Sequence, residues 1–98
     1  MTDRQAYVAF NLTERIGPAR LAPLVASSGS VAAAWEAYPH KVSRAGGEVD
    51  VEREFALAEK YGVEILTPAD EMYPARLKDA PGAPLALYVR GDVAALSK

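Results

Sequence analysis

Cysteine is missing from this sequence, and histidine occurs once, at position 40. The absence of cysteine excludes a disulfide framework, a zinc ribbon and a thiol nucleophile, and it is typical of proteins of the reducing cytoplasm. A lone histidine with no partnering carboxylate motif provides neither a metal site nor the base of a catalytic triad. No glycine-rich phosphate loop is present either. We therefore expect no metal, no cofactor and no enzymatic activity, and we assign His40 to the surface or to a helix cap.

Long apolar runs and strong basic charge are also missing. The longest apolar stretch, Ala83–Val89, is far shorter than the roughly 20 residues that span a bilayer. The first five residues, Met-Thr-Asp-Arg-Gln, contain no apolar segment of the kind found in secretory signals. These features predict a cytoplasmic protein without a membrane span.

The formal net charge of −2 is unevenly distributed along the chain. Residues 1–46 carry a net charge of +2, and residues 47–98 carry a net charge of −4. A surplus of +2 permits weak contact with phosphate groups, but a dedicated nucleic-acid-binding surface carries a much denser basic charge.

Apolar residues recur at helical spacing in four segments before residue 62. We expect one helix from an Asp3 cap to about Thr13, one beginning at Pro18, one capped by Ser30, and one capped by Asp50 that stops at Gly62. The expected apolar faces comprise Tyr7 and Phe10; Leu21, Leu24 and Val25; Val31, Ala34, Trp35 and Tyr38; and Val51, Phe55, Ala58 and Tyr61.

Two of these side chains, Leu24 and Phe55, are predicted to be buried in the core. Trp35 is also assigned to the core rather than to stacking on a nucleic-acid base, because it shares a helical face with Val31 and Tyr38. Residues 40–49 are expected to hold one further helical turn. The acidic run from Glu48 to Glu54 is explained by helix capping and solvation.

The character of the sequence changes after Gly62. Val63–Thr67 is rich in strand-forming residues, and Leu85–Val89 is a continuous apolar run between a proline and a glycine. Such runs are typical of strands buried on both faces, as in a parallel sheet. We therefore expect a helical domain over residues 1–62, followed at 63–98 by the opening strands of an α/β sheet. Two strands cannot cover both faces, so this part is expected to take neighbours from another chain or a longer polypeptide.

Two motifs resemble the DprA (Smf) family of bacterial DNA-processing proteins. Tyr73-Pro74-Ala75-Arg76-Leu77 is similar to the family's Tyr-Pro-x-x-Leu, and Pro84–Gly91 is similar to its Pro-x-x-Leu-Tyr-x-x-Gly. Upstream, Arg15–Leu21 resembles the family's N-terminal helical hairpin, and Gly62–Thr67 resembles the strand before the Tyr-Pro motif. The resemblance covers nearly the whole chain.

This resemblance implies an N-terminal domain similar to a sterile alpha motif, followed by an extended Rossmann-like domain. It implies a homodimeric protein that binds single-stranded DNA and passes it to the RecA recombinase during natural transformation. The family's Val-Gly-Ser/Thr-Arg motif and basic DNA-binding pocket follow the region covered here, and no position of this sequence matches them. The 98 residues are accordingly expected to be the N-terminal, accessory interaction part of such a protein.

Arg15-Ile16-Gly17 also resembles the turn of a helix-hairpin-helix motif, in which backbone N–H groups meet a DNA phosphate. Here Arg15 replaces the first glycine of the Gly-x-Gly turn, which compromises a close backbone approach, so we favour a plain hairpin turn. If the turn does contact DNA, Arg15, Gly17 and Arg20 are the candidate residues. Nonspecific DNA binding by this hairpin and a stand-alone protein-interaction module are the alternatives to the DprA interpretation.

The Tyr73–Pro74 pair has both a structural and a functional interpretation. Pro74 restricts the backbone of Tyr73 to extended conformations, which suits a turn whose aromatic ring packs against a sheet. We prefer this packing role over a role in facing a ligand.

Overall fold

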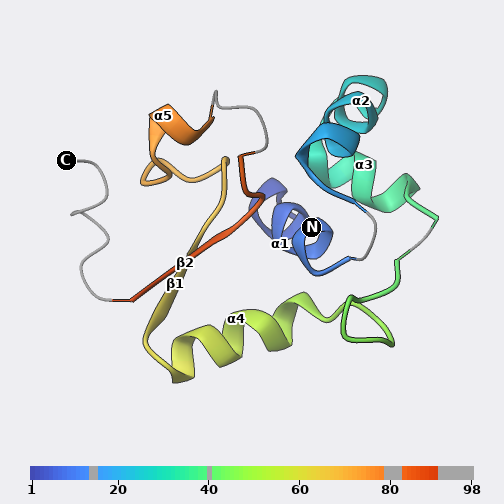
Figure 1. Ribbon diagram of the computed structural model, residues 1–98. Helices are drawn as coiled ribbons and strands as arrows, with labels where there is room; N and C mark the ends of the chain where they lie inside the picture. The colour runs from blue at the N-terminus through green and yellow to red at the C-terminus, as the bar shows by residue number, and fades with distance from the viewer. Residues whose placement is uncertain (14–15, 40, 79–82, 91–98) are drawn as a thin grey trace.

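The computed structural model describes residues 1–13, 16–39, 41–78 and 83–90. In chain order the elements are α1 (Asp3–Leu12), α2 (Pro18–Ser28), α3 (Val31–Ala37), α4 (Val51–Lys60), β1 (Val63–Leu66), α5 (Ala75–Lys78) and β2 (Leu87–Arg90). The chain thus combines helices with a two-stranded sheet (Figure 1), as the sequence predicts. The short helix α5, in the proline-containing segment after β1, was not predicted.

Most of the predicted helix boundaries are confirmed. Pro18 occupies the first turn of α2, the Ser30 side chain accepts a hydrogen bond from the Ala33 N–H at the start of α3, and the Asp50 side chain caps α4 in the same way through Arg53. Gly62, with a φ of 67°, follows the end of α4, where a left-handed residue without a side chain ends a helix at low cost.

The cap of α1 differs from the prediction. Thr2, not Asp3, is the N-cap, because its side chain accepts from the Gln5 N–H while the Gln5 side chain accepts from the Thr2 N–H. This reciprocal pair is a capping box. The Asp3 carboxylate instead accepts a hydrogen bond of 3.1 Å from the backbone N–H of Ala32. Asp3 therefore connects the first turns of α1 and α3.

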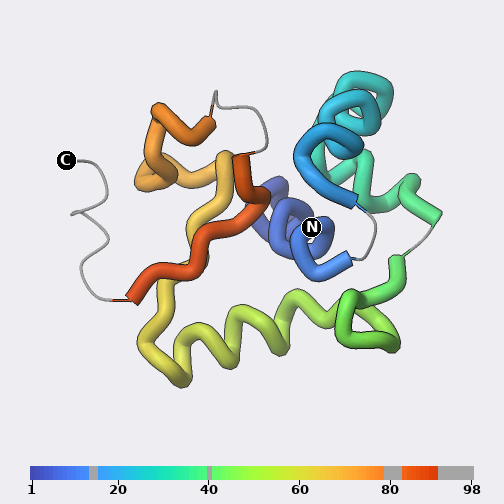
Figure 2. The backbone as a smooth tube through the Cα atoms, in the orientation of Figure 1, coloured from blue at the N-terminus to red at the C-terminus, as the bar shows by residue number. Residues whose placement is uncertain are grey.

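Helix α1 lies in the middle of the molecule, with α2 and α3 on one side, the sheet on the other and α4 below (Figure 1). Four of its residues, Ala6, Val8, Ala9 and Phe10, are fully buried. Phe10 belongs to a cluster formed mainly with α2 and α3, whereas Val8 packs in a second cluster with Ala58, Ile65 and Ala86. The second cluster unites α1 and α4 with the sheet, and the segment that enters β2 runs beside α1 (Figure 2).

In the first cluster, Phe10 packs edge to face against Trp35 and Tyr38. The ring centroids of Phe10 and Trp35 are 5.1 Å apart, and Trp35 is only 8% exposed. The assignment of Trp35 to the core is therefore confirmed. Leu24 and Phe55 are only half-buried, contrary to the prediction, because each lies at the margin of its cluster. Tyr61 is also outside the core at 60% exposure, since it follows the last residue of α4.

The two strands pair antiparallel, with Ile65 opposite Tyr88 and Leu66 opposite Leu87. The expectation of strands buried on both faces, as in a parallel sheet, is wrong for the described residues, because side chains of β2 alternate between half-buried and exposed. Leu85 and Ala86, which begin the apolar run, are buried against the helices before the strand starts. The run therefore combines a packed lead-in with an ordinary one-sided strand.

Arg4 connects α1 to the turn that follows β1. Its Nη2 atom donates to the Ile65 carbonyl oxygen at 2.8 Å, and its Nε atom donates to the Asp70 carboxylate at 3.0 Å. The other Asp70 oxygen accepts from the backbone N–H and the hydroxyl of Thr67, which is fully buried. The guanidinium group also lies 4.7 Å from the centroid of the Phe55 ring. Arg4 thus holds the sheet against the helices.

The segment between α3 and α4 contains no helix among its described residues. Isolated β-bridges join Val42 to Glu48 and Thr13 to Ser43, so the predicted helical turn in 40–49 is wrong for the described residues. The described part forms a tight turn instead, in which Val42 pairs with Glu48, and Ser43 pairs with Thr13 at the end of α1. His40 lies outside the described residues, so its assignment to the surface or to a helix cap stays a prediction.

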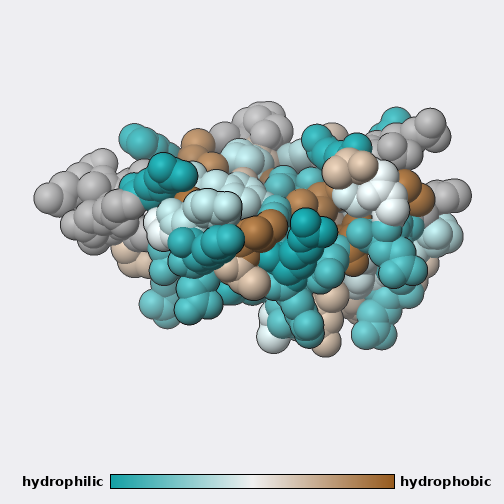
Figure 3. Space-filling model, turned by 90° about the horizontal axis from the view of Figure 1, so that it is seen from below, coloured by the Kyte–Doolittle hydropathy of each residue, from teal (hydrophilic) through white to brown (hydrophobic). Residues whose placement is uncertain are grey.

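The surface on the side of α4 is mainly hydrophilic, with small apolar patches (Figure 3). Tyr88 lies on this side, and its hydroxyl donates a hydrogen bond of 2.8 Å to Glu54. Burial and this bond raise the pKa of Tyr88 well above its ordinary value. No helix of the described residues has the length and apolar composition needed to cross a membrane.

Phe10 and Phe55 differ in burial, so we expect their truncation to lower the stability of the protein by different amounts. Phe10→Ala should lower the free energy of unfolding by about 3–5 kcal/mol, the usual loss for a fully buried phenylalanine, and Phe55→Ala should lower it by roughly half as much or less. Chemical denaturation monitored by circular dichroism measures both, with Tyr61→Ala as an exposed control that stays near wild type. Equal losses for the two phenylalanines would contradict the central position of α1.

Candidate functional site

The hairpin between α1 and α2 carries the residues that the sequence nominated for DNA contact. Arg15 lies outside the described residues, whereas Gly17 and Arg20 share the first turn of α2, where the Arg20 N–H donates to the Gly17 carbonyl oxygen at 3.1 Å. The Arg20 residue is exposed. The structure therefore brings two of the three predicted residues together at one helix end.

Gly17 is the N-cap of α2, but its conformation does not require glycine. Its φ of −132° is extended backbone that any residue adopts. No heavy atom lies within 4 Å of the position that a Cβ atom would take. No side chain caps α2, its first residue Pro18 has no N–H group, and the Arg20 N–H donates to the Gly17 carbonyl oxygen.

Arg44 braces this hairpin from a distant part of the chain. Its Nε atom donates to the Thr13 carbonyl oxygen at 3.2 Å, its Nη2 atom to the Ile16 carbonyl oxygen at 3.4 Å, and its backbone N–H to the Leu12 carbonyl oxygen at 2.8 Å. These carbonyls belong to the end of α1 and to the connection that follows, where helical partners run out. Arg44 is therefore a capping residue of the hairpin.

Sequence reasoning missed this role because the carbonyl groups that accept from the Arg44 side chain lie 28 to 31 residues away in the sequence. No local pattern marks an arginine as the cap of a distant helix. A second basic residue, Lys41, donates to the Glu36 carbonyl oxygen at 3.3 Å and lies 5.3 Å from the Trp35 ring centroid. Arg44 and Lys41 thus both have partners within the protein.

Tyr73 connects the two motifs that resemble the DprA family. It is 3% exposed, and its hydroxyl donates a hydrogen bond of 2.8 Å to the carbonyl oxygen of Pro84. Burial raises the pKa of Tyr73, so its hydroxyl stays protonated and available as a donor. Pro74 is buried beside it. The burial that the packing interpretation of Tyr73–Pro74 requires is confirmed, whereas packing of the ring against the sheet stays a prediction.

The described residues contain no cluster of His, Cys, Asp and Glu side chains suited to a metal ion. Among the described residues, burial raises the pKa of the tyrosines at positions 7, 73 and 88. Comparison with known proteins gives no match to a family model and no match to a curated protein. A functional assignment therefore depends on the motifs and on their geometry.

Arg44→Ala should lower the free energy of unfolding by about 1–2 kcal/mol, because it leaves the Thr13 and Ile16 carbonyl groups without their side-chain donor. Arg76→Ala is the matched control, since Arg76 is exposed on α5. Thermal or urea denaturation of the three proteins measures the difference. A loss for Arg44→Ala no larger than that for Arg76→Ala would show that Arg44 does not brace the hairpin.

Proposed function

We propose that this chain is the N-terminal portion of a DprA-family protein, a cytoplasmic protein that binds single-stranded DNA and loads RecA in natural transformation. In this proposal the helices α1 to α4 form the domain similar to a sterile alpha motif, and β1 and β2 open the Rossmann-like domain. The full-length protein is a homodimer without catalytic activity. Residues 1–62 serve as an accessory interaction domain.

The hydrogen bond between Tyr73 and Pro84 is the observation that carries the proposal. Each motif is short, and a short match is weak support on its own. The two motifs are nevertheless joined by a bond of 2.8 Å from a tyrosine that is almost completely buried. Leu85, the next residue of the second motif, is itself buried in the cluster around α1. Motifs that resemble one family in sequence and also pack together support a common structural unit.

The charges of the described residues favour an accessory role over direct DNA binding. Arg4, Lys41 and Arg44 all have partners within the protein, as described above. By sequence, the helical region 1–62 and the start of the proposed Rossmann-like domain at 63–98 each carry a net charge of −1. Affinity for nucleic acid comes largely from cations that neutralise phosphates. We therefore assign the DNA-binding surface to the remainder of the proposed longer protein.

A second candidate function is nonspecific DNA binding by the hairpin. The observation that favours it is that no side chain caps the start of α2, where Gly17 and Arg20 occupy one turn. A helix N-terminus of this kind attracts phosphate groups. A third possibility, a stand-alone protein-interaction module, requires no DNA binding by either the chain or a longer protein.

Fluorescence anisotropy with a labelled single-stranded oligonucleotide tests the first proposal. At about 0.1 M salt, where exposed charges are already substantially screened, the 98-residue chain should bind weakly or not at all. A longer protein that contains the proposed remainder should bind tightly, and its affinity should fall steeply as the salt concentration rises. Tight, saturable binding by the 98 residues alone would move the DNA site into the described part.

The hairpin hypothesis has its own test. Arg15→Ala combined with Arg20→Ala should leave the affinity of the longer protein for single-stranded DNA nearly unchanged if the hairpin is only a turn. Each lost phosphate contact would instead weaken binding and reduce the salt dependence by about one counterion. A tenfold loss of affinity in the double variant would favour the hairpin as the DNA-binding site, provided that its circular dichroism spectrum matches wild type.

A further inference from the structure

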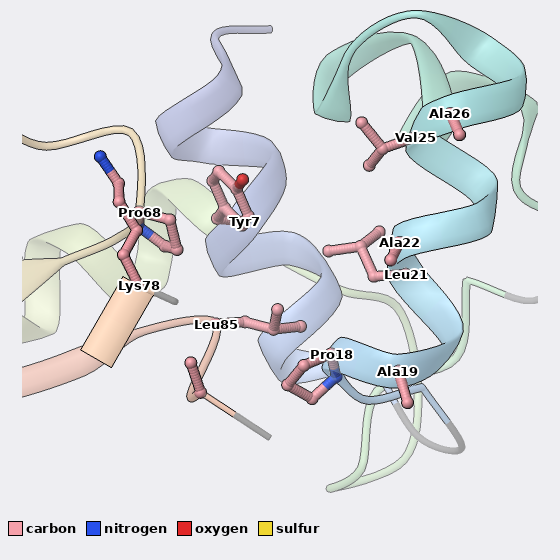
Figure 4. A pocket seen from close by; sticks show the side chains of 11 residues that line it. Tyr7, Pro18, Ala19, Leu21, Ala22, Val25, Ala26, Pro68, Lys78 and Leu85 are labelled. Carbon is pink, nitrogen blue, oxygen red and sulfur yellow. The ribbon is translucent and has the colours of Figure 1, made fainter. Parts of the chain in front are cut away.

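The two apolar clusters do not divide the chain at residue 62, where the secondary structure changes. Leu85, in the lead-in to β2, is buried in the first cluster, and its neighbour Ala86 is buried in the second. Figure 4 shows Leu85 and Leu21 of α2 pointing into the same space beside α1. Domains that move independently have separate cores, and few contacts cross the boundary between them. The described part of this chain has the opposite arrangement.

The connection between α4 and β1 is a tight turn. Tyr61 and Gly62 alone separate the last residue of α4 from the first residue of β1. The Tyr61 N–H donates to the Leu57 carbonyl oxygen at 3.1 Å, and the Gly62 N–H donates to the Glu59 carbonyl oxygen at 3.2 Å. A connection between mobile domains is usually an exposed linker that makes few contacts. Both residues of this connection are instead bonded to the last turn of α4.

Side-chain hydrogen bonds of the described residues also cross residue 62. Arg4, on α1, donates to the Ile65 carbonyl oxygen and to the Asp70 carboxylate, which lie 61 and 66 residues away in the sequence. Tyr88, on β2, donates to Glu54, on α4, over a separation of 34 residues. Separation of the helices from the sheet would break these bonds and expose the apolar surface of the second cluster to water, so a partial opening at this point is costly.

We infer that α1 couples the helical region, residues 1–62, to the described residues of 63–90, so that the two regions fold and open as one unit. This inference goes beyond the proposed function, because it makes the accessory interaction domain a fixed part of the protein and not a hinged appendage. A ligand that binds only the folded form of either region then stabilises both regions.

The fluorescence of Trp35 tests this coupling, because Trp35 is the only tryptophan of the sequence and lies in the first cluster. Ile65→Ala removes a buried side chain from the second cluster, on β1. In urea unfolding of the 98-residue chain, this variant should lower the midpoint of the Trp35 transition as much as the midpoint measured by circular dichroism. A Trp35 midpoint equal to that of wild type would overturn the coupling.

Two further variants of β1 control this experiment. Glu64→Ala, at an exposed position of the same strand, should leave both midpoints close to wild type. Ile65→Val removes a single methylene group and keeps the test usable where Ile65→Ala does not fold. Its two midpoints should fall together by a smaller amount, whereas a fall seen by circular dichroism alone would again contradict the coupling.

A variant on the other side of α1 gives the reciprocal test. Leu21→Ala truncates a side chain of α2 that is 3% exposed in the first cluster. In hydrogen exchange followed by NMR, the slowest amides of β1 and β2 should lose as much protection as those of α3, because amides of one cooperative unit exchange through the same opening. Strand amides that keep their wild-type protection while the helical amides lose theirs would show two separate units. Neither experiment includes nucleic acid, so either result leaves the oligonucleotide test of the proposed function unaffected.

Discussion

The burial of α1 on two sides is the constraint on which the rest of the structure depends. Phe10 faces the helical cluster and Val8 faces the cluster that includes the sheet, and both side chains are completely buried. A helix with two apolar faces has no stable position on the surface of a protein, so other elements must cover both. The cluster of Val8, Ile65 and Ala86 extends across residue 62, where the character of the sequence changes. The change in secondary structure therefore does not coincide with a break in the core.

The polar contacts of α1 follow from this central position. A buried helix still needs partners for its terminal backbone groups and for the polar groups of the elements packed around it. At the first turn, Asp3 accepts from the start of α3, and Arg4 donates to β1 and to the turn that Asp70 closes. At the opposite end, Arg44 donates to the carbonyl groups around Thr13. Side chains from three regions of the sequence thus fix the orientation that apolar packing alone leaves undetermined.

The features that the sequence predicts well are those determined by neighbouring residues. Ser30, Asp50 and Gly62 mark helix boundaries because each acts on backbone groups within a few positions. Depth of burial was predicted less well: Phe55 has the right spacing for a core residue, but its exposure depends on where α4 lies relative to α1. The direction of the sheet depends on how the connection packs, and the contacts of Arg4 and Arg44 span dozens of residues. Of the candidate site, the hairpin position was predictable, whereas the Arg44 contacts that brace it were not, because Arg44 meets its acceptors only in the fold.

The same reasoning explains why a count of charges is a poor guide to the function of this chain. In the sequence, the basic residues before position 46 suggest a weak phosphate-binding surface. In the structure, Arg4 pairs with Asp70, and Arg44 and Lys41 donate to backbone carbonyl groups. A cation already engaged in such contacts must give them up before it can neutralise a phosphate, and that exchange reduces any gain in affinity. The contacts that hold α1 and the hairpin in place therefore oppose direct phosphate binding by Arg4, Lys41 and Arg44.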